Sequence, residues 1–166
     1  MAQWEPEQIV TQSLLERLID RDPQANADPP PSRAQSVRLL KSSLRRDLEW
    51  LLNARRTPDA VGREFGLLEH SLYNYGVPDL TAINRESAQD RARLGRIIEQ
   101  TLAAFEPRLK KVKVTQIEAA SATQHVLRFQ IEGLLDMDPA PELISFDTVL
   151  QLSSGEYQVK GDSGAG

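Results

Sequence analysis

The stretch SVRLLKSSLRRDLEWLLNARRTP, residues 36–58, contains the apolar pattern on which the fold is built. Its apolar side chains recur at steps of three or four, the spacing that places residues on one helical face, at Val37, Leu40, Leu44, Leu48 and Leu51. Leu52 and Trp50 widen this face. The pattern predicts a core helix that begins after Ser36 and ends before Pro58, since proline disfavours helical dihedrals in the preceding residue. We expect its leucines to pack on a sheet and Trp50 to anchor the edge of that contact.

Upstream, residues 21–35 contain four prolines and almost no large apolar side chain, which predicts an extended, semi-rigid linker. Before it, Ser13 and Glu16 have the S-x-x-E spacing that opens a helix. The apolar side of that short helix consists of Leu14, Leu15, Leu18 and Ile19. A helix this short is not stable alone, so it must dock on its own domain or on a partner. We therefore interpret residues 1–20 as an N-terminal docking helix, detached from the body by the linker.

Downstream, the residues between the long helices are rich in turn formers, and Asp79 is placed to cap a short helix over residues 80–83. A second long helix is predicted from Asn84 or Ser87 to Phe105, and Pro107 stops it. Beyond this point apolar residues alternate with polar ones, which predicts about three or four strands. The fold class is therefore α+β, with N-terminal helices followed by a small antiparallel β-meander packed on a long helix. We assign residues 36–160 to this single domain and 161–166 to a flexible tail.

Composition places the chain among ordinary globular proteins, with 166 residues, 40% hydrophobic and 27% charged. Its net charge of −4 argues against a mainly electrostatic grip on nucleic acid, although a local basic patch could persist. The absence of cysteine excludes disulfides and thiolate metal sites. We find no secretory leader and no long apolar run in the sequence, and we expect a cytoplasmic protein.

No motif in the sequence indicates catalysis. The two histidines, His70 and His125, are far apart and lack a nucleophile or carboxylate in a recognisable arrangement. No metal-ligand spacing or phosphate-binding glycine loop occurs, so we expect no metal and no cofactor. A glycosidase needs only two carboxylates, and acidic residues are plentiful, yet Asp47 and Glu49 face different directions on a helix. We assign no catalytic residue.

The corner FEPRL, residues 105–109, is the best candidate for a contact site. Glu106 precedes Pro107 and is pushed toward an extended conformation, which would point Glu106 and Arg108 the same way. An arginine fork beside a carboxylate suits pairing with charges on another chain. The alternative is an ordinary exposed turn. In either case we expect exposed charges, whose replacement by alanine costs about 0 to 1 kcal/mol. The edges of the small sheet offer a second mode of contact, by strand addition.

Several segments together resemble a known family: SLLERLID, the proline-rich spacer, SVRLLKSSLRRDLEWLLNARR, SLYNYGVPDL and FEPRLKKVKV. In order and approximate spacing they look like the baseplate wedge subunit of bacterial type VI secretion systems, the TssE family. That family is similar to a wedge protein of contractile phage tails whose family was labelled lysozyme-like. The resemblance covers the chain from about Ser13 to Lys160.

The resemblance implies a structural, non-enzymatic role in a cytoplasmic baseplate near the inner membrane. Expected partners are other wedge subunits and the first ring of the contractile sheath, whose assembly the subunit would template, with no nucleic acid, small-molecule substrate or membrane insertion. The family's Glu-Pro-Arg interaction motif falls on Glu106, Pro107 and Arg108. The docking helix, with Leu14, Leu15 and Leu18, fits a wedge partner. A peptidoglycan-cleaving, lysozyme-like hydrolase remains the rival interpretation, and a generic adaptor protein the third.

Overall fold

The computed structural model describes residues 10–19, 31–58, 65–80, 84, 87–117 and 126–162. In chain order it has α1 (Leu14–Leu18), α2 (Arg33–Asn53), α3 (Gly66–Glu69), the 3-10 helix η1 (Leu72–Asn74), α4 (Ala88–Phe105) and the strands β1 (Leu109–Ile117), β2 (Val126–Leu135), β3 (Glu142–Gln151) and β4 (Glu156–Asp162). The strands form an antiparallel sheet in the order β1-β2-β3-β4. The predicted α+β class, helices first and then a meander, is confirmed.

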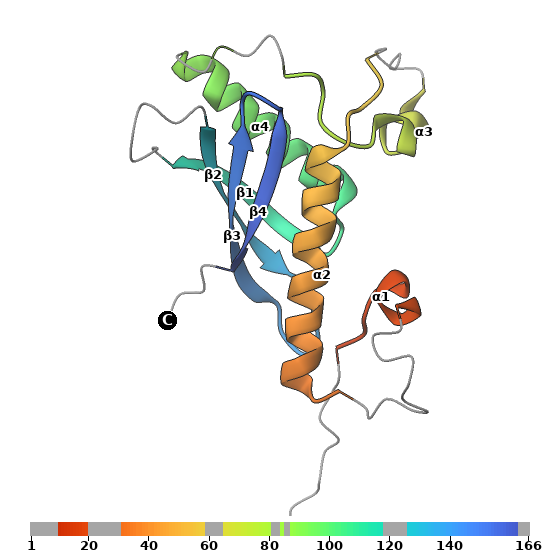
Figure 1. Ribbon diagram of the computed structural model, residues 1–166. Helices are drawn as coiled ribbons and strands as arrows, with labels where there is room; N and C mark the ends of the chain where they lie inside the picture. The colour runs from red at the N-terminus through yellow and green to blue at the C-terminus, as the bar shows by residue number, and fades with distance from the viewer. Residues whose placement is uncertain are drawn as a thin grey trace, which may run out of the picture.

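The molecule has a helical layer and a sheet layer. Helix α2 packs along β4, α4 packs along β1, and the two helices also contact each other. In Figure 1 the strands lie on one side of α2, while α1 and α3 lie on the other. None of the described helices combines the length and apolar character that a membrane crossing requires.

Helix α2 begins earlier than the sequence pattern predicts. Ser32 caps it, and Gln35 completes a reciprocal capping box, in which each side chain accepts a backbone N–H of the other residue. The prediction of a start after Ser36 is wrong, because the capping signal lies inside the segment assigned to the linker. Ser36 is instead a buried residue of the first turns. Residues 20–30 of the predicted linker lie outside the described residues.

The core lies between the helices and one face of the sheet, as the alternation in the strands predicts. Every second residue of β2 is buried, from Leu127 to Leu135. Gly133 belongs to this set because a Cβ there would lie 2.7 Å from the side chain of Leu109, which fills the space. The core leucines and isoleucines of the two long helices are Leu40, Leu44, Leu48, Leu51, Leu52, Leu94, Ile98 and Leu102.

Trp50 does not anchor the edge of the core, so that prediction is wrong. Its side chain is 55% exposed. The ring lies under the guanidinium of Arg46, 5.0 Å from the ring centroid, which is a cation–π contact at the surface of α2. Trp50 lies beside a residue of the apolar stripe, but the helix turns its ring away from the sheet.

Other boundaries follow the sequence more closely. Of the two predicted starts of α4, Asn84 and Ser87, the structure has the second: Ser87 caps the helix, its side chain accepting the N–H of Asp90. Gly76 takes a positive φ of 101°, where the chain returns to α2 and Val77 pairs with Arg55 in a parallel bridge. Of the predicted flexible tail, residues 161–162 belong to β4, and residues 163–166 lie outside the described residues. Residues 81–83 of the predicted short helix also lie outside them.

Replacing Leu48 by alanine tests the core. Leu48 is fully buried, so Leu48→Ala is expected to lower the free energy of unfolding by about 2 to 5 kcal/mol, through lost burial and the cavity left behind. Chemical denaturation measures this. Leu67→Ala is the control, because Leu67 is almost fully exposed and should change stability by less than about 0.5 kcal/mol. Equal effects of the two changes would contradict the placement of Leu48.

The burial of Tyr157 can be tested through the pH dependence of the protein's stability. Its hydroxyl is buried and has no hydrogen-bond partner among the described residues. Burial raises its pKa above the usual value of 10. Because burial favours the neutral phenol, ionising Tyr157 costs more in the folded state than in the unfolded state. The protein therefore keeps its full stability below pH 10 and loses stability as the pH rises above 10.

We expect Tyr157→Phe to raise the free energy of unfolding at neutral pH by about 0 to 1 kcal/mol, because no hydrogen bond is lost. Above pH 10 the variant should lose less stability than the parent protein. Denaturation curves at neutral and alkaline pH measure both effects. Tyr73→Phe, at an exposed position, is the control. A marked loss of stability at neutral pH would show that the hydroxyl does have a partner.

Candidate partner-binding site

The corner between α4 and β1 is built around Glu106, which is the C-cap of α4 and only 5% exposed. Its backbone N–H donates to the carbonyl of Leu102, and its own carbonyl accepts the N–H of Leu109. Glu106 is therefore bonded both to the last turn of α4 and to the first residue of β1. Pro107, in between, is exposed.

Arg108 pairs with Glu106 through two hydrogen bonds. Its Nε donates to Oε1 of Glu106 at 2.7 Å and its Nη2 to Oε2 at 2.6 Å, the bidentate geometry of an arginine and a carboxylate. Its backbone N–H also donates to Oε1, at 3.2 Å. As predicted, the two side chains lie on the same side of the corner. The expectation that both charges are exposed is wrong, because Glu106 is buried and Arg108 keeps only 25% of its side chain exposed.

A third charge joins the corner from α2. Nη2 of Arg108 also donates to Oδ2 of Asp47, at 2.8 Å. The pKa of Arg108 is raised above its ordinary value, mostly by the hydrogen bonds to Glu106 and further by Asp47. These effects outweigh burial, which lowers the pKa. The carbonyl of Arg108 accepts the N–H of Asp136, which follows β2. One residue thus connects the end of α4, the middle of α2 and the end of β2.

The ion pairs continue to the N-terminal helix. Asp47 accepts hydrogen bonds from Nε and Nη2 of Arg46, both at 3.2 Å. Nη1 of Arg46 donates to Oε2 of Glu16 in α1, at 3.2 Å. We call the five residues Glu16, Arg46, Asp47, Arg108 and Glu106 the charge chain. It alternates in sign and joins α1, α2 and the corner.

Helix α1 is therefore not detached from the body, and that prediction is wrong. Ser13 caps it as predicted, accepting the N–H of Glu16. The carboxylate of Glu16 is buried against Arg46. Before α1, the N–H of Val10 donates to Oγ of Ser36 at 3.3 Å, and the side chain of Gln12 donates to the carbonyl of Ser36 at 2.7 Å. Polar contacts, which no apolar pattern reveals, fix α1 to α2.

With Glu16 turned inward, the apolar side of α1 is left exposed. Leu14, Leu15, Leu18 and Ile19 are exposed, Leu18 most of all at 81%. Leu14, Leu15 and Leu18 therefore lie outside the core of the described chain. Their role in binding a partner stays a prediction.

The structure adds an apolar surface that the sequence analysis missed. Around α3 and η1 the exposed large side chains are Phe65, Leu67, Leu68, Leu72 and Tyr73. With α1 and Trp50 they make up all the exposed large apolar residues of the described chain except Ile117 and Leu143. In Figure 1, α1 and α3 both lie on the side of α2 away from the sheet. Because exposed apolar side chains gathered on one side mark contact surfaces, this side of α2 is the candidate site.

Tyr75 lies between the charge chain and this region. Its ring meets Phe105 edge to face, with centroids 5.5 Å apart. Burial raises the pKa of its hydroxyl, and the nearby carboxylates of Asp47 and Glu106 raise it further. The tyrosine therefore stays neutral beside the acidic members of the charge chain.

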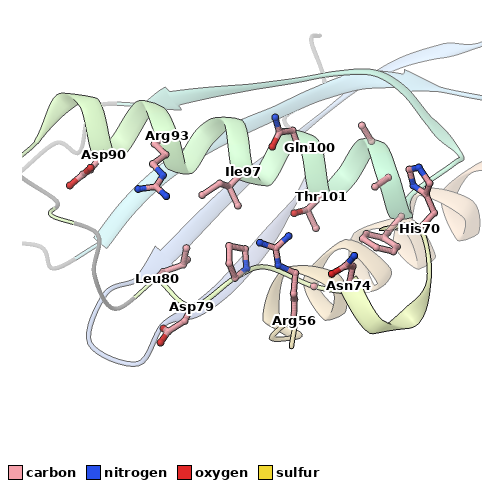
Figure 2. Close-up of a pocket in the computed structure, with 15 residues that line it drawn as sticks. Arg56, His70, Asn74, Asp79, Leu80, Asp90, Arg93, Ile97, Gln100 and Thr101 are labelled. Atoms are coloured by element: carbon pink, nitrogen blue, oxygen red, sulfur yellow. The ribbon is translucent and has the colours of Figure 1, made fainter. Parts of the chain in front are cut away.

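A groove of about 780 Å³ lies between α4 and the segment that precedes it, and Figure 2 shows the side chains that line it. Ile97 and Thr101 approach it from α4, and Leu80 and Arg56 from the other side. Its two carboxylates are engaged: Asp79 pairs with Arg55 at 3.8 Å, and Asp90 accepts the N–H of Asn84 at 3.0 Å.

The described residues give no support to hydrolase or metal chemistry. The buried carboxylates among them, Glu16 and Glu106, are both paired with arginines and so are not presented to a substrate. Within the same residues, no group of three or more candidate ligands could hold a metal ion. His125 lies outside the described part of the chain, and His70 is exposed.

Comparisons with known proteins give two matches. The family model described as baseplate wedge protein gp25 matches residues 38–140. Among solved structures, a chain of "The baseplate complex from the type VI secretion system" is similar, with a TM-score of 0.45 and 23% sequence identity. The similarity covers 66% of this chain and 93% of that chain. No curated protein matches the sequence.

Replacing Arg108 by alanine tests the charge chain. The change leaves Glu106 buried without its partner, which costs about 3 to 5 kcal/mol for a fully buried pair. Because Arg108 is partly exposed, we expect Arg108→Ala to lower the free energy of unfolding by about 2 to 4 kcal/mol. The control is Arg55→Ala, since the pair of Arg55 with Asp79 is exposed and should be worth less than about 1 kcal/mol. A melting temperature unchanged by Arg108→Ala would refute the structural role of the pair.

Proposed function

The chain belongs to the family of baseplate wedge protein gp25, and from this premise we propose that it is a structural, non-enzymatic wedge subunit in the baseplate of a type VI secretion apparatus. In this role it connects the wedge complex to the first ring of the contractile sheath and acts as a template for sheath assembly. The family match over residues 38–140 is the observation that carries the proposal. It includes most of α2, all of α4, the corner, β1 and β2.

The placement of apolar surface supports a role in assembly. A subunit that works by contact needs exposed apolar side chains on a rigid support, and this chain has them on α1, Trp50 and the region of α3 and η1. We propose that Leu14, Leu15 and Leu18 bind another wedge subunit. The contact of Glu16 with Arg46 orients α1 so that these leucines point away from α2.

We propose a second contact at the corner. Pro107 is exposed there, and the bidentate pair beside it holds the backbone in place. In this arrangement Glu106 positions Arg108, and the exposed quarter of Arg108 remains available to an acidic group of a partner. The motif therefore acts as a rigid contact point whose charges are largely satisfied within the chain.

We place the protein in the cytoplasm, in a baseplate near the inner membrane, without a cofactor, small-molecule substrate or nucleic acid. The rival hydrolase activity finds no supporting feature among the described residues, because both of their buried carboxylates are held by arginines. We propose sheath contact through the edge of the β-sheet, where backbone N–H and C=O groups can accept a strand.

The leucines of α1 provide the test. We expect the triple change Leu14→Ser, Leu15→Ser and Leu18→Ser to leave the melting temperature nearly unchanged, because these side chains are exposed. The same change should remove other baseplate proteins from a pull-down of the tagged protein from its native cells, read by mass spectrometry. Leu143→Ser, which replaces an exposed leucine of β3, is the matched control and should retain them.

Two results would contradict the proposal. Full recovery of baseplate proteins with the triple variant would show that α1 is not the contact. Absence of baseplate and sheath proteins from the pull-down with the unaltered protein, in cells that express the secretion genes, would contradict the assembly role itself.

A further inference from the structure

The outer edge of β4 is bonded to side chains of α2. Asn53 provides the clearest contact: its Oδ1 accepts the N–H of Tyr157 at 2.8 Å, and its Nδ2 donates to the carbonyl of Tyr157 at 2.9 Å. A single carboxamide thus satisfies both backbone groups of one edge residue. A residue of a neighbouring strand would make the same pair of hydrogen bonds.

The next outward-facing residue of β4 is bonded in the same way. The N–H of Val159 donates to Oε2 of Glu49 at 3.2 Å, and its carbonyl accepts Nη1 of Arg45 at 3.4 Å. Arg45, Glu49 and Asn53 are spaced by four residues, so they lie on one face of α2 at intervals of about 6 Å. Alternate residues of a strand repeat at about 6.6 to 6.8 Å. The step from Glu49 to Asn53 therefore matches the step from Val159 to Tyr157, and Arg45 bonds to Val159 as well. At these two strand residues the helix side chains can take the place of a further strand.

The opposite edge of the sheet, β1, has no such contacts. Within the described part of the chain, no side-chain hydrogen bond reaches the backbone of Leu109–Ile117. Lys110, Lys111 and Lys113 are exposed, and no described ion pair includes them. The register of β1 with β2 is regular from Lys113 to Ile117, after the bulge at Lys111. This regular stretch presents an edge that can accept a strand.

Lys113 begins the regular stretch, and Lys110 and Lys111 lie at the bulge just before it. Their charge favours some pairing partners over others. Two copies of β1 would bring like charges together, which disfavours pairing between copies of this chain. An incoming strand with acidic side chains would instead meet opposite charges. The charge at this edge therefore selects a different protein, and it selects one with acidic residues in an extended segment.

We propose that Arg45, Glu49 and Asn53 close the β4 edge, so that the sheet accepts an added strand at β1 only, from an extended acidic segment of a partner protein. This inference rests on the proposed assembly function and specifies the edge that it uses. The three α2 side chains act as a specificity device: they leave the sheet one open edge, and so fix the side on which the partner joins.

Photo-crosslinking in native cells that assemble the apparatus tests the choice of edge. A photoreactive amino acid is placed at Thr115 in β1, at Gln158 in β4, or at Leu18 in α1, all exposed positions. We expect Thr115 to give a crosslink to a partner whose crosslinked peptide is acidic, and Gln158 to give none. Leu18 reports whether the protein has entered the baseplate.

The outcomes separate the two proposals. A partner crosslink from Gln158, or none from Thr115 while Leu18 captures a baseplate protein, would overturn the choice of edge and leave the assembly role standing. A crosslinked peptide from Thr115 that is basic would overturn the charge argument. No crosslink at any of the three positions would contradict the assembly role, and with it the proposal about the edge.

The closure itself is tested in the purified protein by Asn53→Leu, which removes both hydrogen bonds to Tyr157. We expect amide hydrogen exchange at Tyr157 to accelerate about tenfold, because two edge hydrogen bonds are lost, while exchange at Phe146 in the interior of the sheet stays unchanged. In cells, Gln158 should then give crosslinks in this variant. Arg38→Leu is the control, at an exposed position of the same helix.

If Asn53→Leu does not fold, Asn53→Asp replaces it. The aspartate retains the acceptor for the Tyr157 N–H and loses the Nδ2 donor, which bonds the carbonyls of Tyr157 and Glu49. The expected result is the same new crosslink from Gln158, with Tyr157 exchange between that of the parent and that of an open edge. Unchanged exchange and no new crosslink in a folded variant would show that α2 does not close the edge.

Discussion

The arrangement of this protein depends on the contacts of Arg108. Its guanidinium is bonded to Glu106 at the end of α4 and to Asp47 in the middle of α2, and its backbone carbonyl accepts the N–H of Asp136, which follows β2. A planar donor that serves two carboxylates sets direction as well as distance, which a point charge cannot do. Arg108 therefore fixes how the helical layer meets the sheet at the point where the chain turns from one to the other.

From this contact the charge chain extends to the N-terminal helix. Arg46 lies between Asp47 and Glu16, and its guanidinium also covers the ring of Trp50. Helix α1 is too short to be stable alone, so its position is given by this pair and by the contacts at Ser36. The surface we propose for partner binding is thus positioned by polar contacts that lead back to the core of the fold.

Helix α2 performs three tasks with three faces. Leucines such as Leu44 and Leu48 fill the core against the sheet. Asp47 and Arg46 belong to the charge chain. The third face carries the side chains bonded to the edge of β4, among them Asn53. A helix can do this because residues four apart share a face, as Leu44 and Leu48 do on the core side and Glu49 and Asn53 do beside β4. The same geometry explains why α2, rather than the sheet alone, decides which surfaces of the molecule are open to partners.

The sequence by itself determined the α+β class, the long helices, the strand alternation and the cap at Ser13, because these follow from local periodicity and from hydrogen bonds between residues close in the chain. It also singled out the corner at Glu106 and Arg108. Only the tertiary structure decided that Glu106 is buried and Arg108 largely covered, that Asp47 joins them across 61 positions of sequence, and that Trp50 is exposed. Pairing between distant side chains leaves no periodic trace, since any of the chain's 20 basic and 24 acidic residues could have been the partner. The contacts at the β4 edge likewise depend on the tertiary structure. Nothing in the sequence around Asn53 indicates that its side chain bonds to the backbone of Tyr157, which is distant in the chain.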